Sequence, residues 1–368
     1  MIEIPENTAR AESGPVNLYG LDPTAIEDLF LASGHARFHA RQLARWLYQR
    51  GATDFASMTD LSRSLRAELA GRFRVHRPAL VDRRTSPGGE ADKYLLELAD
   101  GRRIESVLLR NRDRHTICIS SQAGCALACT FCATARLGLL RNLDAGEIAG
   151  QISEVAPAVP EGGPAFNIVF MGMGEPLHNY GEVVRSIRLL SDPDAFNISP
   201  RRITVSTSGL VPQIARLAEE ALPVRLAISL NATTDEVRDE IMPINRRFPI
   251  RALMLAGRRF AERTGRRVTL EYVLLKGVND TPQDAARLAK LASGLPAKVN
   301  LLSFNRHEGS PYESPSAEAV DVFARLLLPS APAVTVRKSR GDDIMAACGQ
   351  LVAGQPMKPL RIDRKRTA

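Results

Sequence analysis

The chain of 368 residues is 44% hydrophobic and 24% charged, which is typical of a globular protein and indicates roughly two domains. Its formal net charge of +8 favours a polyanionic partner. The N-terminus carries acids in place of the apolar stretch of a secretory signal, and no apolar run reaches the roughly 18 residues of a membrane-spanning helix, so we expect a cytoplasmic protein without membrane association.

The N-terminal part of the chain predicts a small helical domain. Residues 22–30, 39–51 and 58–73 have apolar residues at helical spacing, and the last of these helices is expected to start at Thr59 or Asp60. On the second helix a basic stripe is expected, because arginines recur there at every fourth residue: Arg37, Arg41 and Arg45. The stripe is either a solvated arginine face or a surface that contacts RNA phosphates.

Residues 94–109 change to the apolar pattern of strands. Two such runs flank Ala99, Asp100 and Gly101, a turn sequence that predicts a β-hairpin.

The rest of the chain alternates strand-like runs with helical runs. The candidate strands are residues 116–120, 166–171, 202–206, 224–230, 268–275 and 299–304. This α/β alternation predicts parallel strands joined by right-handed crossovers, in either an open doubly wound sheet or a curved partial barrel. In both architectures, ligands bind at the carboxyl ends of the strands.

Polar residues stand where these strands end. The sequence GMGEP follows one strand directly, so Glu175 is placed to bind an amino group, although a plain glycine-rich turn has the same character. Ser206, Ser229 and Asn305 end or follow other strands. A single serine at such a place is usually a cap or a turn, whereas repetition at several strand ends favours a ligand site.

Three of the five cysteines form the pattern C-x3-C-x2-C at Cys125, Cys129 and Cys132. A disulfide framework is not expected in a large cytoplasmic chain with so few cysteines, so metal binding is the leading interpretation. A closed zinc site needs a fourth protein ligand, for which His115 and Cys118 are the nearest candidates. A four-iron cluster with three cysteine ligands instead leaves one iron open for catalysis.

This triplet, with Phe131 before its last cysteine, resembles the signature of radical S-adenosylmethionine enzymes. Further motifs are similar to those of the RlmN-type RNA adenine methyltransferases: CISSQAGCALACTFCATARLGLLRNL, GMGEPLHNY, STSGLVP, IMPIN and RGDDIMAACGQL. The resemblance covers the chain from about residue 18 to about residue 354 and all five cysteines. It implies a radical S-adenosylmethionine partial (β/α)6 barrel with a small N-terminal helical accessory domain and a linking β-hairpin.

The resemblance also implies the division of the chain. We expect an RNA-binding accessory domain at 18–90, a hairpin linker at 91–114, the core at 115–345, and a C-terminal segment at 346–368 with Cys348 and a basic tail.

The same resemblance assigns the site residues. Cys125, Cys129 and Cys132 are implied ligands of a [4Fe–4S] cluster. The implied contacts of S-adenosylmethionine are Gly174, Glu175, Ser206, Ser229, Leu230, Asn231 and Asn305. The family often has histidine at the position of Asn231, so a backbone contact is expected there more than a side-chain contact.

Cys118 and Cys348 have two interpretations. Each is either a small buried thiol without chemistry, or one of a reacting pair. Cys118 ends a strand-like run, and Cys348 lies in a stretch where Asp342 or Asp343 is expected to start a helix. In the resembling family the pair reacts: the C-terminal cysteine is methylated, and the other then forms a disulfide with it.

Two further residues are expected to assist this pair. Glu105 matches the family's proposed proton acceptor, although a carboxylate on a hairpin strand more often faces solvent. A helix end or Arg340 is expected to favour the thiolate form of Cys348.

The resemblance implies an enzyme that methylates carbon 2 of adenosine in 23S rRNA, in the peptidyl-transferase region, and in tRNA next to the anticodon. It implies two molecules of S-adenosylmethionine per turnover, an electron donor such as flavodoxin, and a monomer. Two alternatives stay open: a related methyltransferase specific for carbon 8 of the same rRNA adenine, and a non-enzymatic zinc-binding RNA or ribosome factor.

Overall fold

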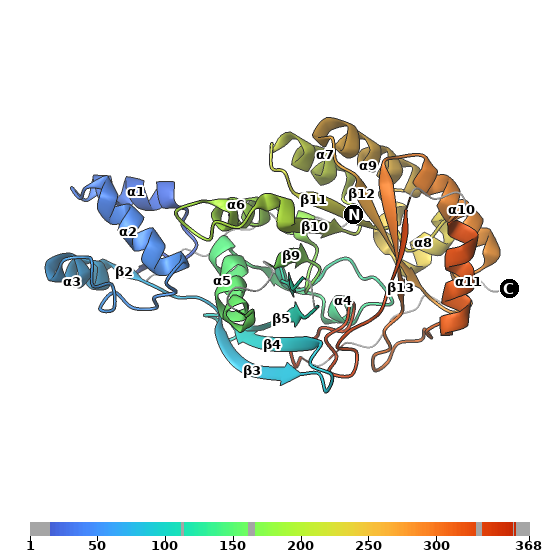
Figure 1. Cartoon of the computed structure of the whole chain (residues 1–368), viewed down its shortest axis with the longest axis horizontal. Helices are drawn as coiled ribbons and strands as arrows, with labels where there is room; N and C mark the ends of the chain where they lie inside the picture. Colours follow the sequence, from blue (N-terminus) through green and yellow to red (C-terminus); the bar gives the residue numbers. More distant parts are fainter. Residues whose placement is uncertain (1–14, 112–113, 161–165, 329–332, 356, 358–368) are drawn as a thin grey trace.

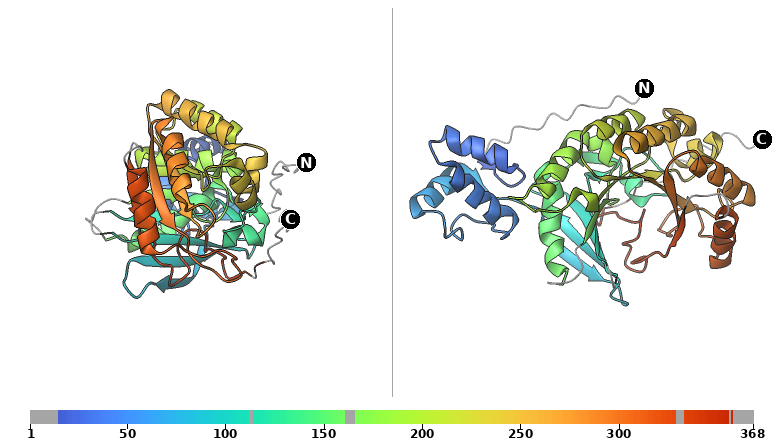
Figure 2. Two further views of the ribbon diagram at one scale, coloured as in Figure 1. Left: turned by 90° about the vertical axis from the view of Figure 1, so that its right-hand side faces the viewer. Right: turned by 45° about the horizontal axis from the view of Figure 1, so that its top comes forward.

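The computed structural model describes residues 15–111, 114–160, 166–328, 333–355 and 357. A small lobe of helices lies beside a larger core that is built on one sheet (Figures 1 and 2). The predicted basic tail at 361–368 falls outside the described residues.

The lobe confirms the three predicted N-terminal helices. They are α1 (Pro23–Ala32), α2 (Arg37–Tyr48) and α3 (Arg63–Arg72). The expected start of α3 at Thr59 or Asp60 is wrong, because the side chain of Ser62 accepts the N–H of Leu65 at 3.2 Å and caps the helix. Asp60 instead accepts a hydrogen bond from the indole of Trp46.

The arginine stripe on α2 is only partly available to a partner. Arg37 pairs with Glu27 at 2.9 Å, and Arg45 pairs with Asp194 of the core at 3.1 Å. Arg41 lies between them and is exposed. The ion pair of Arg45 therefore ties the lobe to the core, and Arg41 is the member of the stripe best placed to meet an external anion.

One strand pair closes the lobe, and one further contact joins the lobe to the core. The short strands β1 (Val16–Asn17) and β2 (Phe73–Arg74) pair in parallel and close the lobe on itself. The hydroxyl of Tyr19 contacts the hydroxyl of Ser153, on the core helix α5 (Ala145–Val155), at 2.5 Å.

One sheet organises the core, in the strand order β14-β13-β12-β11-β10-β9-β6-β5-β4-β3. The parallel strands of the partial barrel are β6 (Thr116–Cys118), β9 (Asn167–Phe170), β10 (Ile203–Thr207), β11 (Arg225–Ser229), β12 (Val268–Leu274), β13 (Ala297–Ser303) and β14 (Val334–Arg337). Antiparallel strands extend it beyond β6: β5 (Arg103–Leu109), β4 (Ala91–Glu97) and β3 (Ala79–Thr85). A separate pair is β7 (Gln122–Gly124) with β8 (Leu139–Asn142).

All six predicted core strands and the predicted hairpin are confirmed. The sequence missed β14 and β3. Every residue of β3 is exposed, so its sequence ALVDRRT lacks the apolar alternation of a half-buried strand. Since β3 joins the sheet, the helical part of the range 18–90 ends at α3.

Helices cover the outer face of the parallel strands, as Figure 1 shows. They are α5 (Ala145–Val155), α6 (Tyr180–Ser191), α7 (Val211–Glu219), α8 (Asp235–Ile241), α9 (Ile250–Thr264), α10 (Pro282–Ser293) and α11 (Ala317–Leu327). Shorter elements are α4 (Ala133–Leu137) and the 3-10 turns η1 (Ala156–Ala158), η2 (Pro176–Asn179), η3 (Pro200–Arg202) and η4 (Pro243–Arg246). In the described part of the chain no helix has the length and apolar character to cross a bilayer.

The sheet is buried on both faces over most of its parallel strands, as expected beneath covering helices. Polar groups nevertheless occur inside. Glu271 on β12 accepts a hydrogen bond from the side-chain amide of Asn300 on β13 at 2.9 Å, and both residues are buried. A buried polar pair of this kind indicates that the interior serves a purpose besides packing.

Candidate active site

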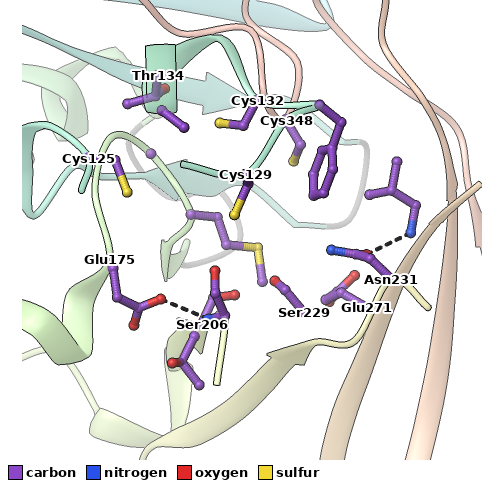
Figure 3. Close-up of a pocket in the computed structure, with 18 of the residues that line it drawn as sticks. Cys125, Cys129, Cys132, Thr134, Glu175, Ser206, Ser229, Asn231, Glu271 and Cys348 are labelled. Carbon is purple, nitrogen blue, oxygen red and sulfur yellow. Dashed lines mark hydrogen bonds between the residues drawn. The ribbon is translucent and has the colours of Figure 1, made fainter. Parts of the chain in front are cut away.

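The three cysteines of the triplet line one cavity at the carboxyl ends of the strands (Figure 3). They lie on the loop between β7 and α4, and Cys132 is the residue that precedes α4. The loop is tied down by backbone hydrogen bonds, from Cys125 N to Gly138 O at 3.0 Å and from Thr130 N to Ile241 O at 3.0 Å. The structure therefore brings these three thiols together at the strand ends.

Burial of the triplet opposes its ionisation. Desolvation raises the pKa of Cys129 to about 12, and it raises the pKa of Cys125 and Cys132 above the usual value as well. Buried thiols become thiolates when a metal centre supplies the compensating positive charge. The triplet thus has the character of a metal-ligand set rather than of free nucleophiles.

An iron–sulfur cluster fits this arrangement. Within the described ranges, no three Cys, His, Asp or Glu side chains lie close enough together to enclose one metal ion. A [4Fe–4S] cluster places each cysteine ligand on a different iron atom, so its three thiols surround a cavity instead of converging on a point.

A buried arginine lies behind the triplet, and sequence reasoning missed it. Arg238 on α8 is 0% exposed, and its guanidinium donates to Leu230 O at 2.9 Å and to Asn245 Oδ1 at 3.0 Å. Desolvation lowers its pKa to about 10, against the opposing effect of Cys129. A fixed positive charge at this place stabilises negative charge on the thiolates.

Glu175 lies across the same cavity from the cysteines (Figure 3). Its carboxylate accepts the N–H groups of Leu177 at 3.0 Å and Ser208 at 2.7 Å, and desolvation raises its pKa to about 7. Gly174, just before it, has φ 99°, and a Cβ there would lie 2.6 Å from Gln122 Cβ, so only glycine fits. The motif is thus a shaped wall of the cavity and not merely a turn.

Three of the other expected cofactor contacts line this cavity, namely Ser206, Ser229 and Asn231. Asn231 has φ 55°, a conformation that asparagine tolerates, and its side-chain oxygen accepts Val273 N at 2.9 Å. Leu230 is fully buried and does not line this cavity. Glu271 also lines the cavity and was missed, because it lies in the middle of a strand and not at its end.

The segment that contains Cys348 is a series of turns, and the predicted helix starting at Asp342 or Asp343 is wrong. Gly341, Met345 and Gly349 have φ values of 73°, 56° and 84°, and these left-handed conformations interrupt any helix.

The turns are anchored to the helix that follows the triplet. Ala133 N donates to Gly349 O at 2.7 Å, and the Thr134 hydroxyl donates to Leu351 O at 2.6 Å. The side-chain amide of Asn305 donates to Cys348 O at 3.2 Å. Asn305 lines a second cavity and not that of the triplet, so its contact here is with the Cys348 segment.

Glu105 anchors the same segment from the hairpin. It is 3% exposed, and one carboxylate oxygen accepts both Val352 N at 2.8 Å and Ala353 N at 2.9 Å. The other oxygen pairs with Lys93 at 3.2 Å, and the Lys93 ammonium also donates to Met345 O at 3.2 Å. Because Glu105 is buried, it is not a solvent-facing carboxylate of the hairpin strand. It lines neither of the two cavities.

Cys118 and Cys348 both line the second cavity. Both are free thiols. Desolvation raises the pKa of each thiol, and Arg337 opposes this for Cys348. The expected helper Arg340 instead donates to Arg110 O at 2.8 Å, and Arg337 is the cation that favours the Cys348 thiolate.

This fold and this site define a radical S-adenosylmethionine enzyme. The family model for the radical SAM superfamily matches residues 119–289, and the model for the ribosomal RNA large subunit methyltransferase N-terminal domain matches residues 16–75.

Comparison with known proteins then identifies the family. The dual-specificity RNA methyltransferase RlmN of Geobacter sulfurreducens is 50% identical over 336 residues, which cover 91% of this chain and 92% of that protein. The protein of the same name from Geotalea uraniireducens is 48% identical and covers 89% of this chain and 93% of its own. A crystal structure of a radical SAM methyltransferase from Sphaerobacter thermophilus is 46% identical, with a TM-score of 0.88 over 92% of this chain and 100% of that chain. The chain belongs to the RlmN family of radical SAM methyltransferases.

Membership of this family confirms the predicted fold class, the methyltransferase activity, and the two cofactors, a [4Fe–4S] cluster and S-adenosylmethionine. The alternative of a non-enzymatic zinc-binding factor is therefore wrong.

Proposed function

We propose that this protein methylates carbon 2 of adenosine in 23S rRNA, in the peptidyl-transferase region, and in tRNA next to the anticodon. One observation carries the proposal: Cys348 lines the cavity of the triplet and also the cavity that contains Cys118. A thiol at this boundary can receive a methyl group on one side and deliver it on the other. The name of the relatives, dual-specificity RNA methyltransferase, supports this class of substrate.

The chemistry of the target explains why two cysteines are needed. Carbon 2 of adenine is an sp2 carbon without useful nucleophilicity, so it does not take a methyl group by simple polar transfer. When bound, the cluster supplies the electron for reductive cleavage of S-adenosylmethionine. Cys348 first accepts a methyl group as a thiolate. A hydrogen atom is then abstracted from this methyl group by the fragment of a second, reductively cleaved S-adenosylmethionine. The methyl carbon bonds to carbon 2 of the adenine, and the hydrogen of carbon 2 leaves as a proton together with one electron, which returns to the cluster that supplied it. The Cys118 thiolate then attacks the Cys348 sulfur, so that a disulfide forms while the bond between that sulfur and the RNA-bound carbon breaks, and this carbon keeps the electron pair and takes up a proton to become the methyl group of the product.

Residues around Cys348 support these steps. Arg337 stabilises the thiolate that accepts the methyl group. Glu175 binds the amino group of S-adenosylmethionine, and Ser206, Ser229 and Asn231 contact the rest of the cofactor in the same cavity.

Glu105 is the proposed acceptor of the adenine proton. Its carboxylate already accepts two backbone N–H groups and pairs with Lys93. This role therefore requires Val352 and Ala353 to release the carboxylate once RNA is bound.

The proposal includes further partners. The helical lobe, through Arg41, binds RNA phosphates. A small acidic electron carrier such as flavodoxin supplies electrons, and the protein acts as a monomer in the cytoplasm.

Product analysis tests the proposal. Anaerobically reconstituted protein is incubated with S-adenosylmethionine, a reductant, and either a 23S rRNA fragment or tRNA, and the digested nucleosides are compared by mass spectrometry with 2-methyladenosine and 8-methyladenosine. We expect 2-methyladenosine from both RNAs. 8-Methyladenosine would point to the related carbon 8 enzyme, and an unmodified tRNA would restrict the substrate to rRNA.

A further inference from the structure

A group of cations lies on the inner face of the barrel at the amino ends of its strands, opposite the end that holds the cysteines. Ser229 on β11 and Glu271 on β12 line the cofactor cavity (Figure 3), and so does Leu302 on β13. Alternate side chains of a strand share one face, so the residues four positions earlier belong to the same inner face. These residues form a basic cluster: Arg225, Arg267 and Lys298.

The register of the strands keeps the basic cluster compact. Ala227 pairs with Thr269, and Thr269 pairs with Lys298, so these three residues form one row across the sheet. Arg225 and Arg267 each lie two positions before a member of this row and are therefore level with each other. With strands about 4.8 Å apart and a rise of about 3.3 Å per residue, neighbouring members of the cluster start within about 8 Å of one another.

The basic cluster has no partner within the protein. Among the residues that the structure describes, no ion pair or side-chain hydrogen bond engages Arg225, Arg267 or Lys298. Other arginines of the same core behave differently: Arg110 pairs with Asp92, and the guanidinium of Arg141 pairs with two acids. Like charges that are held close together repel one another, so an external anion would stabilise this arrangement.

The surroundings of Lys298 show how unbalanced this charge is. Lys298 is half-buried, and desolvation lowers the pKa of its ammonium group. Glu271 opposes this shift, whereas Arg225, Arg337 and Arg267 each add to it. The carboxylate that acts on Lys298 is thus outnumbered by three guanidinium groups, and the local field is positive.

We propose that the basic cluster binds phosphate groups of the RNA backbone, at a distance from the base that is methylated. Guanidinium groups suit this ligand, because their planar N–H donors match the oxygens of a phosphate. The inference rests on the proposed function, and it gives the same RNA a second contact that does not involve the reacting cysteines.

The position of the basic cluster fits an extended polyanion. Arg225 and Arg267 are exposed, so they can meet a ligand that lies across the surface. Lys298 lies four positions before Leu302, a residue that lines both cavities, and this separation is about 13 Å along the strand. An RNA with its target base at the carboxyl ends of the strands can therefore bring the phosphates of other nucleotides to the cluster, whereas a single nucleotide cannot reach both places.

Two variants with matched controls test the inference. Arg267→Ala and Lys298→Met are compared with Arg325→Ala on α11 and Lys290→Met on α10, which remove exposed charges of the same types from the outer helices. Dissociation constants for a tRNA transcript are measured by fluorescence anisotropy at several salt concentrations, and circular dichroism establishes that each variant is folded.

We expect each cluster variant to weaken RNA binding roughly fivefold and to lower the slope of log K against log salt by about one, because one phosphate contact is lost. Lys298→Arg keeps the charge and should bind as the wild type does, and so should both controls. Unchanged affinity and slope in Arg267→Ala and Lys298→Met would overturn the inference.

The ammonium group of Lys298 reports directly on a bound phosphate. Its pKa is measured by NMR after ¹³C-dimethylation of the lysines, and Lys298→Arg identifies its signal. A phosphate in contact stabilises the charged form, so saturating tRNA should raise this pKa, and inorganic pyrophosphate at the same ionic strength should raise it less. A pKa that tRNA leaves unchanged would overturn the inference. An equal or larger rise with pyrophosphate would overturn the assignment to RNA and indicate a site for a free phosphate.

The assay of methylated nucleosides separates this inference from the proposed function. Wild-type protein that yields no 2-methyladenosine refutes the proposed function. Wild-type methylation together with unaltered RNA binding in Arg267→Ala and Lys298→Met refutes only the inference about the basic cluster.

Discussion

The ion pair between Lys93 and Glu105 offers the sharpest test of how the segment that contains Cys348 is held in place. Both side chains are at least nine-tenths buried, with side-chain exposures of 8% and 4%. Lys93 donates a hydrogen bond to Met345 O, and Glu105 accepts hydrogen bonds from the amides of Val352 and Ala353. The pair therefore anchors the segment that contains Cys348 at both of its ends. We therefore predict that Lys93→Met loosens this segment.

The expected magnitude follows from burial. Removing the ammonium leaves a buried carboxylate without its counter-charge, which costs about 3–5 kcal/mol in comparable sites. Arg103→Ala is the matched control on the same hairpin, because its pair with Glu97 is 43% and 40% exposed and is worth about 0–1 kcal/mol. The double variant Lys93→Met/Glu105→Gln should regain part of the loss, since no unpaired charge remains.

Three measurements report how Lys93→Met changes the stability of the protein, the order of the Cys348 segment and the methylation of Cys348. Urea unfolding gives the loss of stability, hydrogen exchange reports the amides of Val352 and Ala353, and mass spectrometry reports methylation of Cys348 without RNA. We expect lower stability, faster exchange and slower methylation in Lys93→Met. A loss no larger than that of Arg103→Ala, with unchanged exchange, would refute the reasoning.

The other predictions concern the cofactor, the thiols and the lobe. Glu175 is ionised only above its raised pKa of about 7, so affinity for S-adenosylmethionine, measured by equilibrium dialysis, should fall as the pH drops from 8 to 6, and Glu175→Gln should remove this dependence. Cys348→Ala should abolish RNA methylation but retain iron and sulfide, and turnover in that variant would disprove the covalent role. Cys118→Ala should accumulate RNA crosslinked to Cys348, visible as a slow-migrating, nuclease-sensitive band. Its absence would remove Cys118 from the release step. Arg41→Glu should raise the dissociation constant for RNA, whereas Arg45→Glu should also lower stability because Arg45 pairs with Asp194. Equal stability of these two variants would contradict the tie between lobe and core.

The sequence was sufficient where the signal is local. The spacing of the triplet and the alternation of strands with helices each depend on neighbours within a few positions, so both could be recognised in the sequence. The conformation around Cys348 depends on distant partners instead. Glu105 binds amides 247 and 248 residues away in the chain, and the helical pattern after Asp342 gave no sign of the left-handed turns that these contacts accommodate. Arg238 escaped notice for a different reason: its partners Leu230 and Asn245 are close in the chain, but an arginine on a charged helix is expected to face solvent.

The turn conformation of the Cys348 segment is itself informative about mechanism. A helix would direct the thiol along one fixed face, and its backbone groups would be satisfied internally. The observed turns leave carbonyl and amide groups free, and these are taken up by Ala133, Thr134, Asn305 and Glu105 on separate elements. The peptide is therefore fixed on both sides of Cys348, while its side chain remains exposed to both cavities. This arrangement suits the role proposed for Cys348, in which the same sulfur meets a methyl donor, a nucleobase and a second thiol in turn.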